Sequence, residues 1–361
     1  MWPEFIDIKA TLDEYRGDSD FLHVKQDVIA EYGEENLRAS WLKTNEELSK
    51  VTTEIMALGQ STIPVLDMAD VNSGKIKEDT RDNIRLRGCF IVRNVIEKSE
   101  VERMHHNLKQ YATDNKGKYA AWPKENPSIL SLYNTPTQNA LRSHAELHGL
   151  MRWINELWNS YSPESDSTSP EPLVYADAIR MRPPKQSFFG LGPHIDAGSL
   201  CRWADPDYRR VYAHIFSGEP ENHDAFDISR RRNANQTAFP GPAHSSVLRA
   251  FQGWTALSKT APRQGTILLY PNVNAAISYI LLRPFFEPPD DETQIMDASK
   301  WKFDSSGSWF PGTFKPQSQL LSPHSHPHLR LKDCLLYVPQ LNPGDTVWWH
   351  TDVSEISMLN W

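Results

Sequence analysis

Apolar residues near the start of the chain recur at the spacing of a helix. They fall at steps of three or four residues among charged positions, with one doubled step, at Leu37, Trp41, Leu48, Val51, Ile55 and Leu58. Residues three or four apart share one face of an α-helix, so this spacing predicts an amphipathic helix that ends at Gly59. We therefore expect a helical N-terminal lead-in over residues 1–60.

Further helices are predicted over residues 76–160, as a helical flank to the second half of the chain. The first covers 76–87, and the next begins at Ser99, which forms a capping box with Glu102. Another carries apolar residues on one face over 138–160. Short segments of strand type lie before and between these helices, at residues 63–67 and 89–92.

The pattern changes after residue 172. Apolar and β-branched stretches separated by Pro and Gly now predict short strands, at Leu173–Met181, Ser246–Ala250, Thr266–Tyr270, Ala276–Leu282 and Leu335–Val338. Such a series is typical of a barrel or sandwich, which we place in a domain of residues 61–361 with its β-rich half over 172–361. The polar stretches 217–243 and 288–327 are long for connections, and we expect them either to wall a pocket or to be mobile surface loops.

Composition narrows the class of protein. The 361 residues are 39% hydrophobic, enough for one large unit with a substantial core. A formal charge of −8 without a basic run argues against nucleic acid as a partner. No apolar run approaches the roughly 20 residues of a membrane helix, and the start lacks the features of a signal peptide. The three cysteines are too few and too widely spaced for a disulfide framework, so we expect a soluble cytoplasmic protein.

His194 and Asp196 carry the sharpest chemical signal. Side chains at i and i+2 of a strand point to the same face, so these two can hold one ion together. Imidazole and carboxylate ligands that leave positions open suit non-haem Fe(II). The pair comes after the predicted strand 175–182 and a turn rich in Pro and Gly.

Other histidines are weaker candidates. His144 and His148 stand one helical turn apart, but we interpret them as ordinary, partly buried residues. Three alternating histidines lie in a polar stretch that Pro327 interrupts, and we expect them in a solvated loop: His324, His326 and His328. Neither a nucleophile elbow nor a phosphate-binding glycine loop is present in the sequence.

Several segments in a fixed order resemble a known family. The order of 63–67, 87–92, His194–Asp196 and Gly344–His350 resembles the Fe(II)/2-oxoglutarate-dependent dioxygenases. Longer segments resemble the DUF1479 group of fungal and bacterial proteins, namely Arg180–Pro184, Leu191–Ser199, Leu282–Phe286 and Pro343–His350. The similarity spans residues 60–352 and is more specific than the His-x-Asp pair alone.

The resemblance implies an α+β fold with a double-stranded β-helix, or jelly roll, and an iron site at one end. His194 and Asp196 would be two of the ligands, and a distal His the third. It further implies 2-oxoglutarate as co-substrate, bound by a basic residue, and oxidation of a small organic molecule. Arginine suits a carboxylate because its N–H donors form a planar fork. Three arginines on predicted strands are therefore candidate anchors: Arg180, Arg182 and Arg283. Each of them could instead pair with an acidic residue on the surface.

The third iron ligand departs from the family pattern. In the family a second His comes after the Gly-Asp-Thr-Val-Trp-Trp-His segment, whereas Glu355 occupies that position here. Three interpretations are open: His350 becomes the ligand, Glu355 replaces the imidazole, or the chain is a truncated product that binds iron poorly. We favour the third, in which the last barrel strand and the usual basic anchor lie beyond Trp361. The alternative function is then a catalytically impaired protein that keeps the fold without turnover.

Overall fold

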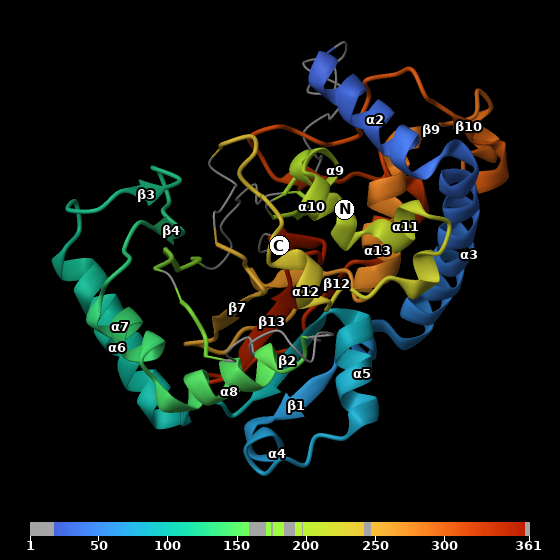
Figure 1. Cartoon of the computed structure of the whole chain (residues 1–361). Coiled ribbons are helices and arrows are strands. Elements are labelled where there is room, and N and C mark those ends of the chain that lie inside the picture. The colour runs from blue at the N-terminus through green and yellow to red at the C-terminus, as the bar shows by residue number, and fades with distance from the viewer. Residues whose placement is uncertain are drawn as a thin grey trace.

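The computed structural model describes residues 18–158, 171–174, 176–183, 192–196, 198–241 and 247–357. Its longer helices are α2 (Ser19–Tyr32), α3 (Glu34–Leu58), α5 (Glu78–Arg87), α6 (Lys98–Asp114), α7 (Pro136–Arg142), α8 (Ala145–Asn155) and α13 (Val273–Leu282). Shorter ones are α4 (Met68–Asn72), α9 (Cys201–Ala204), α10 (Pro206–Val211), α11 (Ala213–Phe216), α12 (Ile228–Arg231) and α14 (Leu331–Cys334). Helix α3 runs along one side of the molecule, and α6 and α7 form the opposite side (Figure 1).

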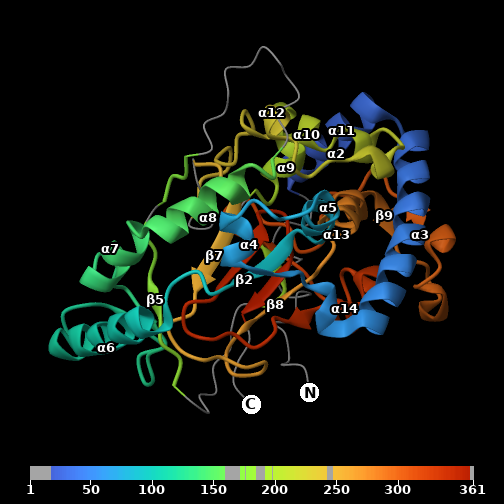
Figure 2. The same ribbon diagram turned by 90° about the horizontal axis from the view of Figure 1, so that it is seen from below.

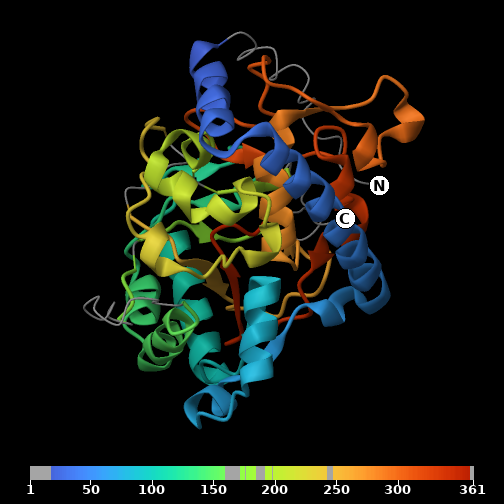
Figure 3. The same cartoon turned by 45° about the vertical axis from the view of Figure 1, so that its right-hand side comes forward.

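The predicted amphipathic helix is observed as α3. Its apolar stripe is buried except for Leu58 at the C-terminal end, and Trp41 stacks on Phe286 with ring centroids 4.4 Å apart. Figure 3 shows α3, in blue, beside the orange α13, with which it packs. Burying aromatic rings of this size supplies much of the apolar stabilisation of a core. The lead-in is therefore joined to the rest of the fold by its hydrophobic face.

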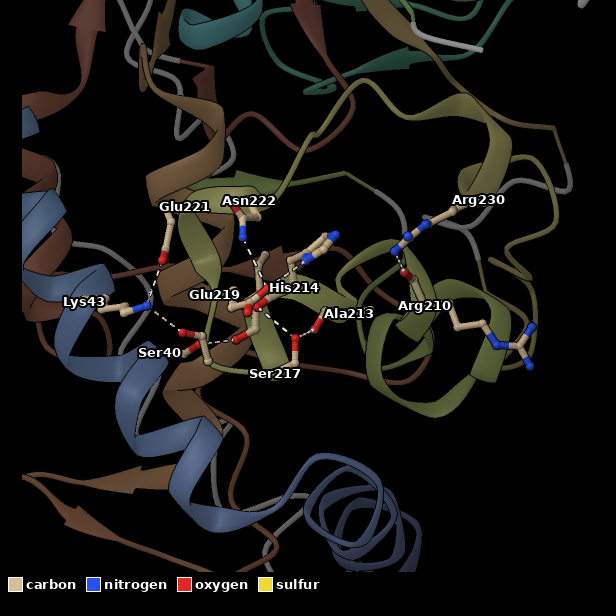
Figure 4. Close-up of polar contacts among 12 residues, drawn as sticks. Ser40, Lys43, Arg210, Ala213, His214, Ser217, Glu219, Glu221, Asn222 and Arg230 are labelled. Carbon is tan, nitrogen blue, oxygen red and sulfur yellow. Dashed lines mark hydrogen bonds and ion pairs between the residues drawn. The ribbon is translucent and has the colours of Figure 1, made fainter. Parts of the chain in front are cut away.

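Polar contacts fix the other flank of α3. Ser40 Oγ donates to the carbonyl oxygen of Ile215 at 2.5 Å, and Lys43 Nζ lies 2.7 Å from Glu221 Oε1. Figure 4 shows Ser40 and Lys43 facing the segment that carries His214 and Glu221. The segment that was predicted as a long polar stretch, 217–243, thus packs in part against α3 and contains α12.

Two sheets form the centre of the fold. The four-stranded sheet has the order β1 (Val65–Asp67), β2 (Cys89–Arg93), β13 (Thr346–His350), β7 (Phe251–Thr255). The five-stranded sheet has the order β11 (Gln319–Leu320), β6 (His194–Ile195), β14 (Glu355–Ser357), β8 (Ile267–Leu269), β12 (Leu336–Tyr337). Figure 2 shows β2, β7 and β8 close together at the centre. The chain crosses from the first sheet to the second between β13 and β14.

Two smaller sheets complete the described part of the chain. One pairs β9 (Phe286–Glu287) with β10 (Lys302–Phe303). The other joins β3 (Ala121–Trp122), β4 (Ile129–Leu130) and β5 (Ile179–Arg180). The mixed α and β class is confirmed, whereas the sheets are small and a jelly-roll barrel stays a prediction. Within the described ranges, no helix has both the length and the apolar character needed to cross a bilayer.

The Gly-Asp motif before β13 has a structural role. Gly344 has a φ of +93°, and a Cβ there would lie 2.1 Å from the carbonyl oxygen of Ile96. Asp345 is buried and accepts from the backbone N–H of Asn342 at 2.8 Å and forms an ion pair with Arg93 at 2.5 Å. Glycine tolerates this backbone conformation without steric cost. The motif therefore shapes the entry into β13.

Several local predictions were wrong. The stretch 276–282 is not a strand but part of α13, whose first turn is capped because Asn272 Oδ1 accepts from the N–H of Ala275. A helix that is buried on all sides is apolar all round, so its sequence resembles a buried strand. The predicted helix 138–160 is divided into α7 and α8, and Glu97, not Ser99, caps α6.

The predicted strands of the second half were only partly right. Strands β8 and β12 fall inside the stretches predicted for them. Only β5 forms within Leu173–Met181, of which Tyr175 lies outside the described residues. Strand β7 begins one residue after the predicted stretch 246–250, whose first residue is also outside the described ranges.

Candidate metal centre

His194 and Asp196 lie side by side at the end of β6. The His194 ring is oriented by a contact of 2.8 Å between its Nδ1 and the carbonyl oxygen of Gly192. This leaves Nε2 facing the Asp196 carboxylate, whose Oδ1 lies 3.4 Å away. A hydrogen bond at one ring nitrogen fixes which nitrogen is free to hold a metal. The arrangement agrees with the pairing expected from the sequence.

Glu355 completes a cluster of three possible metal ligands. It is paired directly with His194 across β14 and β6, and its Oε1 lies 3.8 Å from His194 Nε2. One ligand atom from each of His194, Asp196 and Glu355 lies within 4.8 Å of the others. Glu355 and His194 are buried and Asp196 is partly buried. Among the described residues, these three are the group that could hold a metal ion.

His350 does not join this cluster, which corrects one expectation from the sequence. Its Nε2 lies 3.1 Å from the carbonyl oxygen of Ala225, and its Nδ1 accepts from the N–H of Asp352 at 3.1 Å. Both ring nitrogens are therefore engaged. The ring is fully buried among aromatic side chains of Trp158, Phe226 and Phe251.

Side chains from three other segments hold the Asp196 carboxylate. Ser318 Oγ donates to its Oδ1 at 3.2 Å, and Arg249 Nη1 lies 3.8 Å from its Oδ2. Gln252, with its amide oriented to satisfy both neighbours, donates to Oδ2 at 2.9 Å and accepts from Trp349 Nε1 at 3.2 Å. Trp349 and Gln252 are paired residues of β13 and β7. Groups that orient a metal-binding carboxylate in this way strengthen metal sites.

The three candidate ligands strongly perturb one another. Burial acts to lower the pKa of His194, but the hydrogen bond with Asp196 and the charge of Glu355 outweigh it and raise the pKa to about 9. Burial raises the pKa of Glu355 to about 7 although the imidazolium opposes it. For Asp196 burial acts upward, but the contact with His194 lowers its pKa. A buried carboxylate pair around one imidazole thus holds protons that a cation would displace.

A buried ion pair fixes the turn that leads to Glu355. Asp352 accepts from Arg231 Nη2 at 2.5 Å and from Tyr212 Oη at 3.1 Å. Burial acts to raise the pKa of Asp352, but the charge of Arg231 outweighs it and the pKa lies well below its usual range. Because the turn connects β13 with β14, this pair helps to set where Glu355 lies.

The three arginines proposed as anchors lie in different places. Arg180 is exposed on β5, and its charge opposes only weakly the rise that burial causes in the pKa of Glu355. Arg182 lies just after that strand and donates to the carbonyl oxygen of Gly265. Arg283 is not on a strand: it lies at the end of α13, over the rings of two tryptophans, Trp301 and Trp309, at 4.5 and 4.9 Å.

Arg249 was not singled out in the sequence, yet it contacts a candidate ligand. It lies just before β7, in a stretch that contains no recognisable motif, so the sequence gave no indication of its contact with Asp196.

Two of the histidines placed in a solvated loop are buried. His326 and His328 are 1% and 6% exposed. His326 Nδ1 lies 2.7 Å from Ser325 Oγ, and His328 Nδ1 lies 3.1 Å from Tyr279 Oη. The expectation was wrong because the stretch folds back onto the core through a short 3-10 helix at Pro327–Leu329.

The donor set of the cluster suits a hard divalent cation. One imidazole nitrogen and two carboxylate oxygens are ligands that Fe(II) and Mn(II) accept. Three protein ligands leave further coordination positions for exogenous groups. The buried positions of His194 and Glu355 would keep bulk water from two sides of such an ion. The residues present therefore fit a divalent metal centre.

Comparisons with known proteins give consistent matches. A family model described as Gig2-like matches residues 17–356. The uncharacterized protein YbiU of Escherichia coli K12 is 30% identical over 324 residues, which are 86% of this chain and 72% of YbiU. The crystal structure of GlcNAc Inducible Gene 2 (DUF1479) from Candida albicans has a TM-score of 0.82 at 26% identity, covering 100% of this chain and 74% of that one. A proposed oxidoreductase from Salmonella typhimurium LT2 has a TM-score of 0.76 at 26% identity, covering 93% and 79%.

Proposed function

This chain belongs to the Gig2-like family, and we propose that it is an oxygenase that uses Fe(II) and 2-oxoglutarate to oxidise a small organic molecule. Membership agrees with the DUF1479 resemblance expected from the sequence, which is confirmed. The similar Salmonella protein, itself a proposed oxidoreductase, supports an oxidative reaction. The proposal rests chiefly on one observation, the cluster of His194, Asp196 and Glu355.

The chain's own residues have distinct roles in this proposal. His194 would offer Nε2 to the metal while Gly192 holds its other nitrogen. Asp196 and Glu355 would each offer a carboxylate oxygen, and Gln252 would keep Asp196 in place. A bound Fe(II) would supply the activation of O₂ that couples the oxidation of 2-oxoglutarate to that of the substrate.

Cations near the ligands are the candidate anchors for the anionic co-substrate. Arg249 lies 3.8 Å from Asp196, and the charge of Arg180 acts on Glu355. Arginine can bind a carboxylate through two parallel N–H donors. Arg182 stays a candidate beside Arg180, whereas Arg283 lies among tryptophans and has no described contact with the cluster.

A second function is favoured by the charges of the same ligands. A divalent ion held by two carboxylates carries no net charge, whereas one carboxylate would leave it at +1. A neutral centre attracts an anionic co-substrate less strongly. The alternative is therefore a metal-binding protein that keeps the fold without turnover. One measurement, the release of succinate, distinguishes the two functions.

The test measures metal binding and succinate release on the same preparation. Anaerobic calorimetric titration with Mn²⁺ reports binding, and incubation with Fe(II), 2-oxoglutarate and O₂ reports succinate. Binding together with succinate that is lost in Glu355→Gln supports the oxygenase. Binding without succinate supports the alternative, and failure to bind Mn²⁺ overturns both. Glu221→Gln is a matched control because Glu221 pairs with Lys43 on the surface.

A further inference from the structure

Asp352 lies in a cluster of charged side chains that is sealed from solvent. Arg231 Nη2 lies 2.5 Å from its Oδ2, and Arg202 Nη2 lies 3.9 Å from its Oδ1. The three residues are at most 1% exposed. Arg202 also lies 3.4 Å from the carbonyl oxygen of Asp196, so the cluster borders the candidate metal centre. Helices α9 and α12 supply the two arginines.

The charges of this cluster do not balance. Two guanidinium groups face one carboxylate, Asp352. The neighbouring histidines do not add to the positive charge, because burial lowers the pKa of His223 to about 4 and that of His350 to about 3, and both are neutral near pH 7. The Asp196 carboxylate is engaged elsewhere, by His194, Arg249 and Ser318. One positive charge is left over in a region without water contact.

The surplus charge coincides with donors that have no acceptor. Nε and Nη1 of Arg202, and Nε and Nη1 of Arg231, are buried and make no hydrogen bond with the described residues. Buried polar groups are almost always hydrogen-bonded, and an unpaired buried charge is far more costly than an unpaired neutral group. Two independent observations, charge and hydrogen bonding, thus point to the same kind of partner.

We propose that Arg202 and Arg231 bind a small monovalent anion in the interior of the protein, a halide or a short carboxylate such as formate. One negative charge neutralises the cluster, and its lone pairs accept from the unpartnered guanidinium donors. The proposal is independent of the metal centre, because it uses neither the three ligands nor the oxygenase reaction.

Packing around the arginines limits the size of the anion. A Cβ added at Gly198 would lie 2.7 Å from Tyr208 Oη and 3.1 Å from Arg202 Cζ. The rings of Tyr208 and Tyr212 stack with centroids 5.7 Å apart and cover the guanidinium groups. Large or multiply charged anions would need these residues to move. The charge and this close packing favour a single-atom anion or formate, which has only three non-hydrogen atoms.

The test uses the whole chain, freed of halide by exchange into gluconate at constant ionic strength. Chloride and formate are titrated separately while thermal unfolding is monitored. A ligand present at a hundredfold excess over its Kd should raise the unfolding midpoint by at least about 2 °C, with saturation. Crystals soaked in bromide should show an anomalous peak within hydrogen-bonding distance of Arg202 and Arg231. The two titrations distinguish a halide from a carboxylate.

Arg202→Met supplies the variant, since it removes the surplus charge and leaves the Arg231–Asp352 pair intact. The response to both anions should be lost, whereas Arg210→Met, at an exposed arginine, should keep it. Equal responses in the wild type and Arg202→Met would overturn the proposal. Should Arg202→Met not fold, the bromide map of the wild type decides: no anomalous peak at the four donors overturns it too.

Discussion

Glu355 lies directly opposite His194 in the five-stranded sheet, with Oε1 3.8 Å from the imidazole Nε2. This pairing brings together residues 161 positions apart in the sequence, since 355 − 194 = 161. It places a carboxylate where the resemblance to the family implies a second imidazole. The candidate centre therefore differs in donor type from the one the resemblance implies, and the difference can be measured.

Loss of the Glu355 carboxylate should weaken metal binding. Glu355→Gln removes one charged ligand, and we expect the Kd for Mn²⁺ to rise at least about tenfold, since even the groups that merely orient ligands contribute 10–100-fold. E355H should retain binding because an imidazole can replace the carboxylate. Calorimetric titration checks both. An unchanged Kd in Glu355→Gln would remove Glu355 from the site.

Gln252 should act on the metal only through Asp196. Gln252→Leu removes the donor that holds Asp196 Oδ2, so we expect the Mn²⁺ affinity to fall about 10–100-fold. In the absence of metal, the midpoint of thermal unfolding of Gln252→Leu should differ little from that of the wild type. Gln60→Leu serves as control, because Gln60 is an exposed residue that bonds the carbonyl oxygen of Tyr337. Equal metal affinities for the wild type and Gln252→Leu would contradict this role.

The Asp352–Arg231 pair should matter greatly for stability. Asp352→Asn leaves Arg231 without its buried counter-charge, and breaking such a pair lowers the free energy of unfolding by about 3–5 kcal/mol. The double variant Asp352→Asn with Arg231→Met should recover part of this loss, because the cluster then carries the single surplus positive charge of the wild type, that of Arg202, and not two. Denaturant unfolding of the four proteins measures the coupling. Additive effects of the two substitutions would show that the pair is not a unit.

Acid should destabilise the protein partly through His223. Burial lowers its pKa to about 4, so between pH 6.5 and 4 the unfolded chain binds a proton that the folded chain does not. Stability from this residue is therefore present above pH 6.5 and lost as pH falls, by about 3 kcal/mol in all. His223→Gln should make the pH dependence of unfolding shallower in this window.

The local sequence determined those elements that depend only on residue spacing and backbone conformation. The α3 stripe, the glycine that ends α5 and the Gly-Asp turn before β13 result from spacing and backbone conformation. The same holds for the His194 and Asp196 pair, because two residues at the end of one short strand need no other segment to meet. Helix α13 was mistaken for a strand since complete burial removes the periodicity that separates the two.

Only the tertiary structure decided which residues complete the site. Glu355 reaches His194 because the chain changes sheets between β13 and β14 and because the register sets these two residues opposite each other. Gln252 and Arg249 reach Asp196 from the strand beside β13 and the segment before it. Register and the packing of separate sheets depend on contacts between distant segments, which no local pattern encodes. The sequence by itself determined two candidate ligands, and long-range pairing determined the third.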